Sequence, residues 1–580
     1  MGVLFVFQSF FSEPPEETLP GEETLQAADD LTLGNDSLSP GDELADLGSG
    51  SGTSNLSDPN TVAQIVSTPD PVIIEANRLR GSISPIGVRL DNLILKDYYN
   101  EVGEKAGNVI LFRPEGEVNA YFADFNWRAN SEVELPTKDT VWQTSGSKLT
   151  FETPVEFSWE NSQGIKFKQI ISIDENYLFT VRQIVTNNSG ARIQVAPIGQ
   201  ITRVDTPDTL GFFIMHEGPI GFLGGDLYDR SDDFTYDDLK ELYEDEPNPI
   251  NKRVEIGGVD GWLGFADKYW VSAIVPDQSK SFKARFAYSQ NLGRDQYVSS
   301  YLAEQGAVVD VNQTFESLTY LFAGAKEVAL VDAYEKDYNI PKFDLVVDWG
   351  WFYFLTKPIF YGLEFIGGYV GNVGVSILIL TVFIKLLLFP LANKSYRSMS
   401  RMKKLQPKIK QIRERYGDDK LKVQQETMAL YKKEKANPAA GCLPIFIQIP
   451  VFFALYKVLF VTLEMRHQPF FGWVQDLSAP DGLTFITGFG LFPWDAPGFL
   501  LIGVWPILMG LTMWLQMKLN PQSPDPIQAK IFTFMPIVFT FILAPFPAGL
   551  VIYWTWNNIL SITQQWVIMR KEGITIADVK

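Results

Sequence analysis

The sequence predicts a multi-domain membrane protein in which an N-terminal antiparallel β-sandwich precedes an α-helical core of five transmembrane spans. Its 580 residues exceed what one hydrophobic core accommodates. Residues 72–347 alternate short apolar runs with turn signals, as antiparallel strands do. Long apolar segments occur only after residue 370, and a helix needs roughly 20 apolar residues to cross a bilayer.

Two segments precede the sandwich. Residues 1–11 contain "GVLFVFQSFF", which is apolar but reaches only about 15 Å as a helix, half of the ~30 Å hydrocarbon core. The first basic residue is Arg78, so this segment lacks the charged region of a signal peptide. We therefore expect residues 1–11 to be the remnant of a first transmembrane span whose start is truncated. Residues 12–71 are acidic and rich in Gly, Ser and Pro, which predicts a disordered linker.

The sandwich at 72–347 is predicted from runs such as "IKFKQIISID" and "YLFTVRQIVTN", with turn signals such as "DENY" between them. The region is long enough for two sheets packed face to face. We expect residues 348–372 to form an interfacial helix between the sandwich and the first span of the core.

The five core spans are predicted at 373–392, 441–463, 498–517, 531–547 and 549–569. The last two form one apolar stretch, which as a single helix would measure about 58 Å, nearly twice the hydrocarbon core. Pro545, Pro547 and Gly549 interrupt helix formation there, so the stretch is predicted to fold back as a hairpin.

The orientation follows from the basic residues, which favour the cytoplasmic side. The segment 393–440 is predicted to be a cytoplasmic helical hairpin, because 394–435 holds fourteen basic and five acidic residues. The loop 518–530 and the tail 570–580 carry further basic residues and share that side. The loop 464–497 contains Arg466 as its only basic residue, so we place this loop on the outer side of the membrane.

The composition argues against most catalytic chemistry. With one cysteine and two histidines, neither an intrachain disulfide nor a zinc site is expected. No phosphate-binding loop, HExxH, GxSxG or dinucleotide fingerprint occurs. The formal net charge of −20 is unevenly spread, since the hairpin is basic and the remainder strongly acidic. We expect no catalytic residue, no metal and no cofactor, and a protein that is not an enzyme.

Polar residues inside the predicted spans are the main functional candidates. Lys385 lies nine residues before Lys394, or about 13 Å along one straight helix, which is too far for simple snorkelling of its side chain. A charge at that depth is a functional hypothesis by default. Snorkelling with local bilayer thinning, and ordinary hydrogen bonding between helices, remain the alternatives. The expected hydrated groove is lined by Lys385, Thr381, Gln448, Tyr553, Trp554, Asn557, Ser561 and Gln565.

The hairpin offers a second candidate surface. Its basic residues suit ribosomal RNA or anionic lipid head groups, while the alternative is that they only fix the orientation of the chain. The residues expected to contact the ribosome or targeting machinery are Arg401, Lys403, Lys404, Lys408, Lys410, Arg413 and Arg415.

Four stretches resemble the YidC family of membrane protein insertases, in its Gram-negative form with a large periplasmic domain. They are "NPAAGCLPIFIQIPVFFALYKVLF", "LQPKIKQIRERYGDDK", "FGWVQDLSAPD" and "FTFMPIVFTF" followed by "FPAGLVIYW". The resemblance implies a periplasmic β-supersandwich and a five-helix core with a hydrophilic groove. Lys385 matches a position where the family commonly has arginine, and lysine lacks the planar fork of that residue. Trp554 stands where many relatives have tyrosine.

The implied function is the insertion and folding of integral membrane proteins, alone or with the Sec translocon. The implied partners are nascent membrane proteins, the Sec translocon, the ribosome and signal-recognition machinery, and membrane lipids, with no small-molecule substrate. The implied location is the bacterial inner membrane, with a large periplasmic domain and a cytoplasmic C-terminus. The alternatives are a secondary transporter of an anionic solute and, from the β-domain, a sugar-binding protein or sugar-modifying enzyme.

Overall fold

The computed structural model describes most of the chain after residue 68. The described residues are 69–102, 107–129, 133–209, 215–229, 234–245, 253–417, 419–434, 436, 443–484, 486, 501–520, 526–571 and 573. The predicted remnant span at 1–11 lies outside them, as does nearly all of the predicted linker at 12–71.

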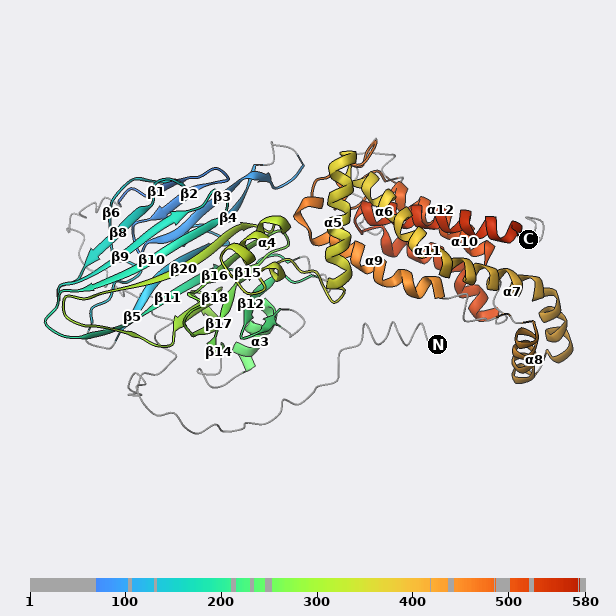
Figure 1. Ribbon diagram of the computed structural model, residues 1–580, viewed down its shortest axis with the longest axis horizontal. Helices are drawn as coiled ribbons and strands as arrows, with labels where there is room; N and C mark the ends of the chain where they lie inside the picture. Colours follow the sequence, from blue (N-terminus) through green and yellow to red (C-terminus); the bar gives the residue numbers. More distant parts are fainter. Residues whose placement is uncertain are drawn as a thin grey trace. The chain divides into compact units, whose positions relative to one another are not determined.

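An 11-stranded sheet forms one layer of the β-domain (Figure 1). Along its main path the order is β14-β17-β18-β11-β5-β3-β2-β1-β7, with β4 on β3 and β19 on β11. Its strands are β1 (Val72–Glu75), β2 (Leu79–Ser84), β3 (Arg89–Tyr99), β4 (Asn108–Phe112), β5 (Tyr121–Ala129), β7 (Lys148–Leu149), β11 (Ile193–Val204), β14 (Arg253–Val259), β17 (Phe282–Asn291), β18 (Arg294–Ala303) and β19 (Ala307–Val309).

A nine-stranded sheet forms the other layer, in the order β13-β12-β15-β16-β20-β10-β9-β8-β6. Its strands are β6 (Gln143–Thr144), β8 (Val155–Glu160), β9 (Ile165–Ile173), β10 (Leu178–Asn187), β12 (Gly218–Leu223), β13 (Asp226–Tyr228), β15 (Gly261–Ala266), β16 (Trp270–Val275) and β20 (Thr314–Ala325). In both sheets the described pairs are antiparallel except β1 with β7, so the predicted antiparallel sandwich is confirmed.

The core of the sandwich follows from the alternation of side chains along each strand. Along β9, the residues alternate between buried and half-buried positions from Ile165 to Ile173. The buried face carries large aromatic residues such as Phe167, which packs on Trp127 of the opposite sheet with ring centroids 5.1 Å apart. The amide of Gln169 also crosses between the layers and donates to the carbonyl of Phe125 at 2.6 Å.

The region after the sandwich is helical (Figure 1). A helix within the β-domain, α3, spans Tyr236–Asp245, and a further helix, α4 (Val328–Asp337), follows the last strand. The remaining helices are α5 (Tyr353–Val370), α6 (Val373–Leu387), α7 (Phe389–Tyr416), α8 (Lys420–Lys433), α9 (Leu443–Val461), α10 (Val504–Leu519), α11 (Pro526–Leu543) and α12 (Ala548–Lys571), with short 3₁₀ helices at Phe343–Val346 and Leu463–Met465. A helical C-terminal region is therefore confirmed.

Helices α6, α9, α10, α11 and α12 lie at the positions of the five predicted spans. Among the described residues, no single helix is long and apolar enough to qualify alone as a membrane span. The pair α6 and α7 meets that criterion together, although the chain bends by 70° between them. Gln448–Val461 and Lys530–Leu543 form shorter apolar helices.

Close packing of α10 and α11 depends on a glycine. A side-chain carbon at Gly510 would lie 2.1 Å from the hydroxyl oxygen of Thr540. Small residues permit such a close approach of two helices. The hydroxyl of Thr540 donates to the carbonyl of Pro536 at 2.8 Å, so it is satisfied within its own helix.

Candidate functional site

Lys385 lies in the last turn of α6, beside the bend of the chain. α6 ends at Leu387 and α7 begins at Phe389. Pro390 occupies the first turn of α7, where a proline needs no partner for the N–H that it lacks. Because the chain bends by 70° at this point, the distance of about 13 Å that a straight helix would put between Lys385 and Lys394 does not apply.

The ammonium of Lys385 is hydrogen-bonded to a neutral hydroxyl. Lys385 is half-buried, and its Nζ donates to Ser561 Oγ on α12 at 2.7 Å. That hydroxyl in turn donates to the carbonyl of Asn557, also at 2.7 Å. Tyr396 of α7 also hydrogen-bonds Ser561, and burial raises the pKa of this phenol, so it stays neutral. Within the described part of the chain, no carboxylate lies within 4.0 Å of Lys385.

Three further predicted residues lie beside this contact. Gln448 on α9 donates its amide to Asn557 Oδ1 at 2.7 Å, which joins α9 to α12. Thr381 is buried and donates its hydroxyl to the carbonyl of Ile377 in its own helix. Tyr553 is buried as well. These side chains border a cavity of about 10 Å³, lined by Thr381, Ile384, Lys385, Leu388, Gln448, Val451, Tyr553 and Asn557.

The size of this cavity limits what it holds. A volume of about 10 Å³ accommodates roughly one water molecule. The arrangement is a small polar junction between α6, α9 and α12.

The polar and aromatic residues along α12 divide between two neighbouring helices. Trp554 packs against Phe452 of α9 with ring centroids 4.7 Å apart. Asn558 instead donates to Thr512 Oγ1 of α10 at 3.1 Å, and Gln565 donates to the end of α10 at the same distance. Successive residues of a helix point about 100° apart, so Asn557 faces α9 while Asn558 faces α10. Trp554 and Gln565 therefore lie away from the cavity.

Sequence reasoning missed two residues of the junction. Trp556 donates its indole N–H to the carbonyl of Leu378 at 3.2 Å and so joins α12 to α6. Tyr396 reaches Ser561 only because the chain bends before α7, and no local sequence signal places it there. Pro390 could have indicated the bend, because a proline is typical of the first turn of a new helix.

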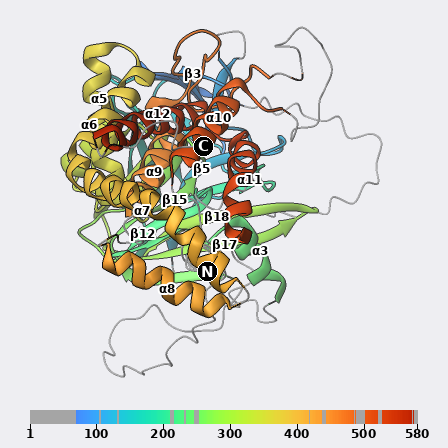
Figure 2. The ribbon, with the colours of Figure 1, turned by 90° about the vertical axis from the view of Figure 1, so that its right-hand side faces the viewer.

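The basic segment forms the expected helical hairpin from α7 and α8 (Figure 2). Asp419 caps α8, since its carboxylate accepts from the N–H of Lys422 at 3.0 Å. Six of the predicted contact residues are exposed: Arg401, Lys404, Lys408, Lys410, Arg413 and Arg415. Lys403 differs, because it is buried and its ammonium lies 3.4 Å from two carbonyls at the end of α10. Lys403 therefore caps a helix of the core.

Comparison with known proteins gives consistent matches over both parts of the chain. Residues 72–362 match the family described as the YidC periplasmic domain, and residues 365–574 match the 60Kd inner membrane protein family. The membrane protein insertase YidC of Rickettsia bellii is 44% identical over 569 residues, covering 98% of this chain and 96% of the relative. The chain belongs to the YidC family of membrane protein insertases.

Other relatives and a solved structure match as well. The membrane protein insertase YidC of Methylobacterium radiotolerans is 49% identical over 508 residues, covering 87% of this chain and 81% of the relative. The crystal structure of an active YidC insertase with its first transmembrane domain resolved covers 86% of this chain and 92% of that chain, at 15% identity and a TM-score of 0.35. The chain is thus a membrane protein insertase of an inner-membrane family with a periplasmic domain, as the sequence motifs predicted.

Proposed function

We propose that the chain inserts its substrates by holding the polar tail of a nascent membrane helix at the junction around Lys385. The observation that carries this proposal is a half-buried ammonium whose hydrogen-bond partner is a neutral serine hydroxyl at 2.7 Å. Charged residues within membranes are costly and are typically retained for function. A carboxylate on the substrate's tail is the counter-charge that Lys385 lacks, and it would bind more strongly there than in water.

The barrier that such a site lowers is the desolvation of the tail. Each unsatisfied polar group in hydrocarbon costs several kcal/mol. Lys385, Gln448 and Asn557 offer donors and acceptors part-way across, and burial of the substrate's apolar segment then drives insertion without a nucleotide. The cavity beside Lys385 holds about one water molecule, so the substrate's tail reaches Lys385 from the half-exposed side of this side chain.

The topology proposed with this function follows the sequence. The five helices α6, α9, α10, α11 and α12 cross the inner membrane, the β-domain and the loop 464–497 are periplasmic, and the C-terminus is cytoplasmic. The six exposed cations of the hairpin, defined above, then face the cytoplasm. We propose that these cations contact the ribosome or signal-recognition machinery and anionic lipid head groups. We also propose that the helical core inserts substrates either alone or together with the Sec translocon.

Reconstitution in liposomes tests the role of the charge. The substrates are two single-spanning proteins that differ only in a short tail carrying either two Asp or two Asn residues. Lys385→Met should reduce insertion of the Asp-tailed substrate about tenfold, equivalent to about 1.4 kcal/mol, and leave the Asn-tailed substrate nearly unchanged. Lys385→Arg keeps the charge and is the matched control, with activity close to the unmodified protein.

Two results would contradict the proposal. Equal loss with both tails would show that Lys385 only holds α6 and α12 together. Full activity of Lys385→Met and of Lys385→Glu with both substrates would show that insertion does not require the positive charge of Lys385.

A further inference from the structure

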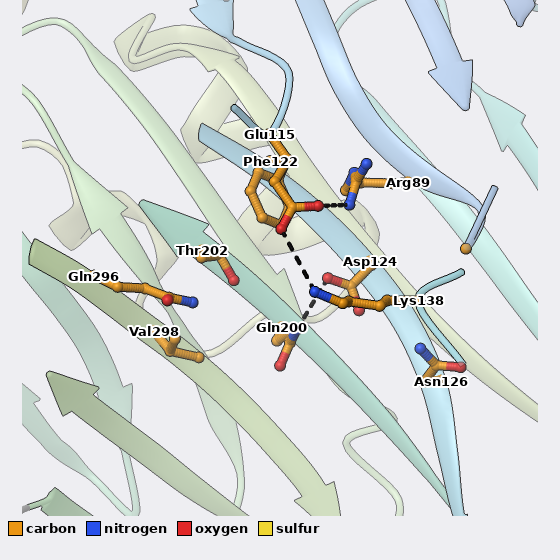
Figure 3. A pocket seen from close by; sticks show the side chains of 11 residues that line it. Arg89, Glu115, Phe122, Asp124, Asn126, Lys138, Gln200, Thr202, Gln296 and Val298 are labelled. Atoms are coloured by element: carbon orange, nitrogen blue, oxygen red, sulfur yellow. Dashed lines mark hydrogen bonds and ion pairs between the residues drawn. The ribbon is translucent and has the colours of Figure 1, made fainter. Parts of the chain in front are cut away.

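The β-domain contains a second polar pocket, far along the chain from the junction around Lys385. Its floor is formed by side chains of β5, β11 and β18 that share one face of the 11-stranded sheet, and its wall by Arg89 at the start of β3 and by residues of the adjoining loops (Figure 3). The cavity measures about 40 Å³ and is lined by Gly87, Arg89, Glu115, Phe122, Asp124, Asn126, Lys138, Gln200, Thr202, Gln296 and Val298.

The position of the floor follows from strand alternation. Asp124 lies directly opposite Gln200 in the register of β5 with β11. Their neighbours Phe125 and Ile201 point the other way, into the sandwich core, and are almost fully buried. The floor is therefore the outer face of the sheet, and its polar side chains contribute nothing to packing between the layers.

Two polar groups of the floor have unused hydrogen-bonding capacity. Thr202 lines the pocket and is 1% exposed, and among the described residues its hydroxyl makes no hydrogen bond, so the hydroxyl is available to a ligand or to water. The carboxylate of Asp124 accepts from the amide of Gln200 at 3.0 Å, but within the described chain no cation lies within 4.0 Å of it. Burial raises the pKa of Asp124 to about 6, so its ionised form destabilises the fold at neutral pH.

The charges of the wall are already paired with each other. Glu115 pairs with Arg89 and lies 3.9 Å from the ammonium of Lys138. The guanidinium of Arg89 also lies over the ring of Phe122, 5.1 Å from its centroid. Arg89 also pairs with Asp91 at 3.3 Å, so two cations face two carboxylates, and this group of charges attracts neither an anion nor a cation strongly.

We propose that this pocket binds the edge of a saccharide. A sugar hydroxyl donates one hydrogen bond and accepts others, which matches a carboxylate, amides and a hydroxyl placed side by side. By the same measure in which about 10 Å³ holds one water molecule, the volume of about 40 Å³ holds a few water-sized groups, which corresponds to one edge of a pyranose ring. The remainder of the ligand lies in solvent, so we expect a dissociation constant on the order of 1 mM.

The test uses the full chain in lipid nanodiscs, because detergents with sugar head groups would compete for the pocket. Saturation-transfer NMR is recorded with D-glucose, D-galactose, N-acetyl-D-glucosamine and methyl α-D-mannoside. We expect transfer to at least one of these sugars. Thr202→Val should weaken binding roughly three- to tenfold, and it removes no hydrogen bond of the described chain, so the protein should remain folded.

A matched variant and a second substitution complete the test. Thr180→Val makes the same change on β10 of the other sheet, and sugar binding should be unaffected. Asp124→Asn keeps the shape of the floor and should also weaken binding. Absence of transfer from all four sugars would overturn the proposal, as would transfer that Thr202→Val and Asp124→Asn both leave unchanged.

Discussion

Two half-buried cations, Arg203 in the β-domain and Lys385 in the helical region, have opposite surroundings. In the β-domain, Arg203 donates to Asp267 at 2.7 Å and to the hydroxyl of Tyr236 at 3.1 Å, and its guanidinium lies over the ring of Tyr121. In the helical region, Lys385 reaches a single serine hydroxyl. The first cation has a full set of partners, and the second lacks a counter-charge within the described residues.

This difference separates structural charges from functional ones. A buried ion pair roughly balances its desolvation cost when both partners are present and is strongly destabilising when one is removed. A buried charge without a partner only adds cost, so its retention indicates a function outside the folded chain. The same criterion selects Asp124 of the β-domain, whose carboxylate accepts from Gln200 at 3.0 Å but has no cation within 4.0 Å among the described residues. The distinction therefore depends on the local environment of each charge and not on its region.

The largest expected change in the free energy of unfolding comes from substitution of Arg203. Arg203→Met leaves Asp267 buried without its partner and should lower the free energy of unfolding by about 3–5 kcal/mol. Chemical denaturation of the full chain, followed by tryptophan fluorescence, measures this. The double variant Arg203→Met/Asp267→Asn should recover part of the loss. If the single variant were as stable as the unmodified protein, the structural role of this pair would be refuted.

Substitution of Asp124 should raise the free energy of unfolding instead of lowering it, and the size of this change should depend on pH. Its folded-state pKa of about 6 exceeds the ordinary value near 4, so the penalty for ionisation is complete above about pH 6 and vanishes as the pH falls toward about 4. Asp124→Asn should therefore stabilise the chain by about 2 kcal/mol at pH 7 and hardly at all at pH 4. Denaturation at both pH values measures the gain.

The control for this pH dependence is Asp205, whose pKa is lowered to about 2, chiefly by the side-chain hydrogen bond from Arg294. Its contribution to stability is present above the ordinary carboxyl pKa and is lost as the pH falls toward about 2. Asp205→Asn should therefore destabilise the chain at pH 7. A gain from Asp124→Asn that did not change with pH would show that ionisation is not its cause.

Lys385 should contribute little to stability despite its place between helices. Lys385→Met removes the cost of a desolvated charge together with one hydrogen bond, so we expect no change or a gain of about 1 kcal/mol in the unfolding free energy. Thermal unfolding in nanodiscs measures this. A loss of more than about 2 kcal/mol, above what a hydrogen bond in a membrane contributes, would instead make Lys385 a structural residue like Arg203.

The sequence predicted the sandwich and the helical region because each has a strong periodicity, such as the alternation along β9. It also singled out Lys385, Gln448 and Asn557 as polar residues inside apolar segments, and the structure brings these three side chains to one cavity. It could not predict which helix each polar residue of α12 faces. That depends on the rotation of α12 between its neighbours and on the 70° bend before α7, which tertiary packing determines.

The smallest expected effect distinguishes two lysines of the same hairpin helix. Lys403 lies 3.4 Å from two carbonyls at the end of α10, where a cation complements the helix dipole, whereas Lys408 is exposed and pairs with Glu434 at 2.9 Å. Lys403→Met should therefore lower the unfolding free energy by about 0.5–1 kcal/mol, while Lys408→Met should change it by less than about 0.5 kcal/mol.

For ribosome binding, measured by co-sedimentation, Lys408→Met should have the larger effect of the two substitutions, because only the exposed lysine is available to an anionic partner. If Lys403→Met reduced co-sedimentation more than Lys408→Met, burial in the described structure would not decide which cations of the hairpin serve as contacts.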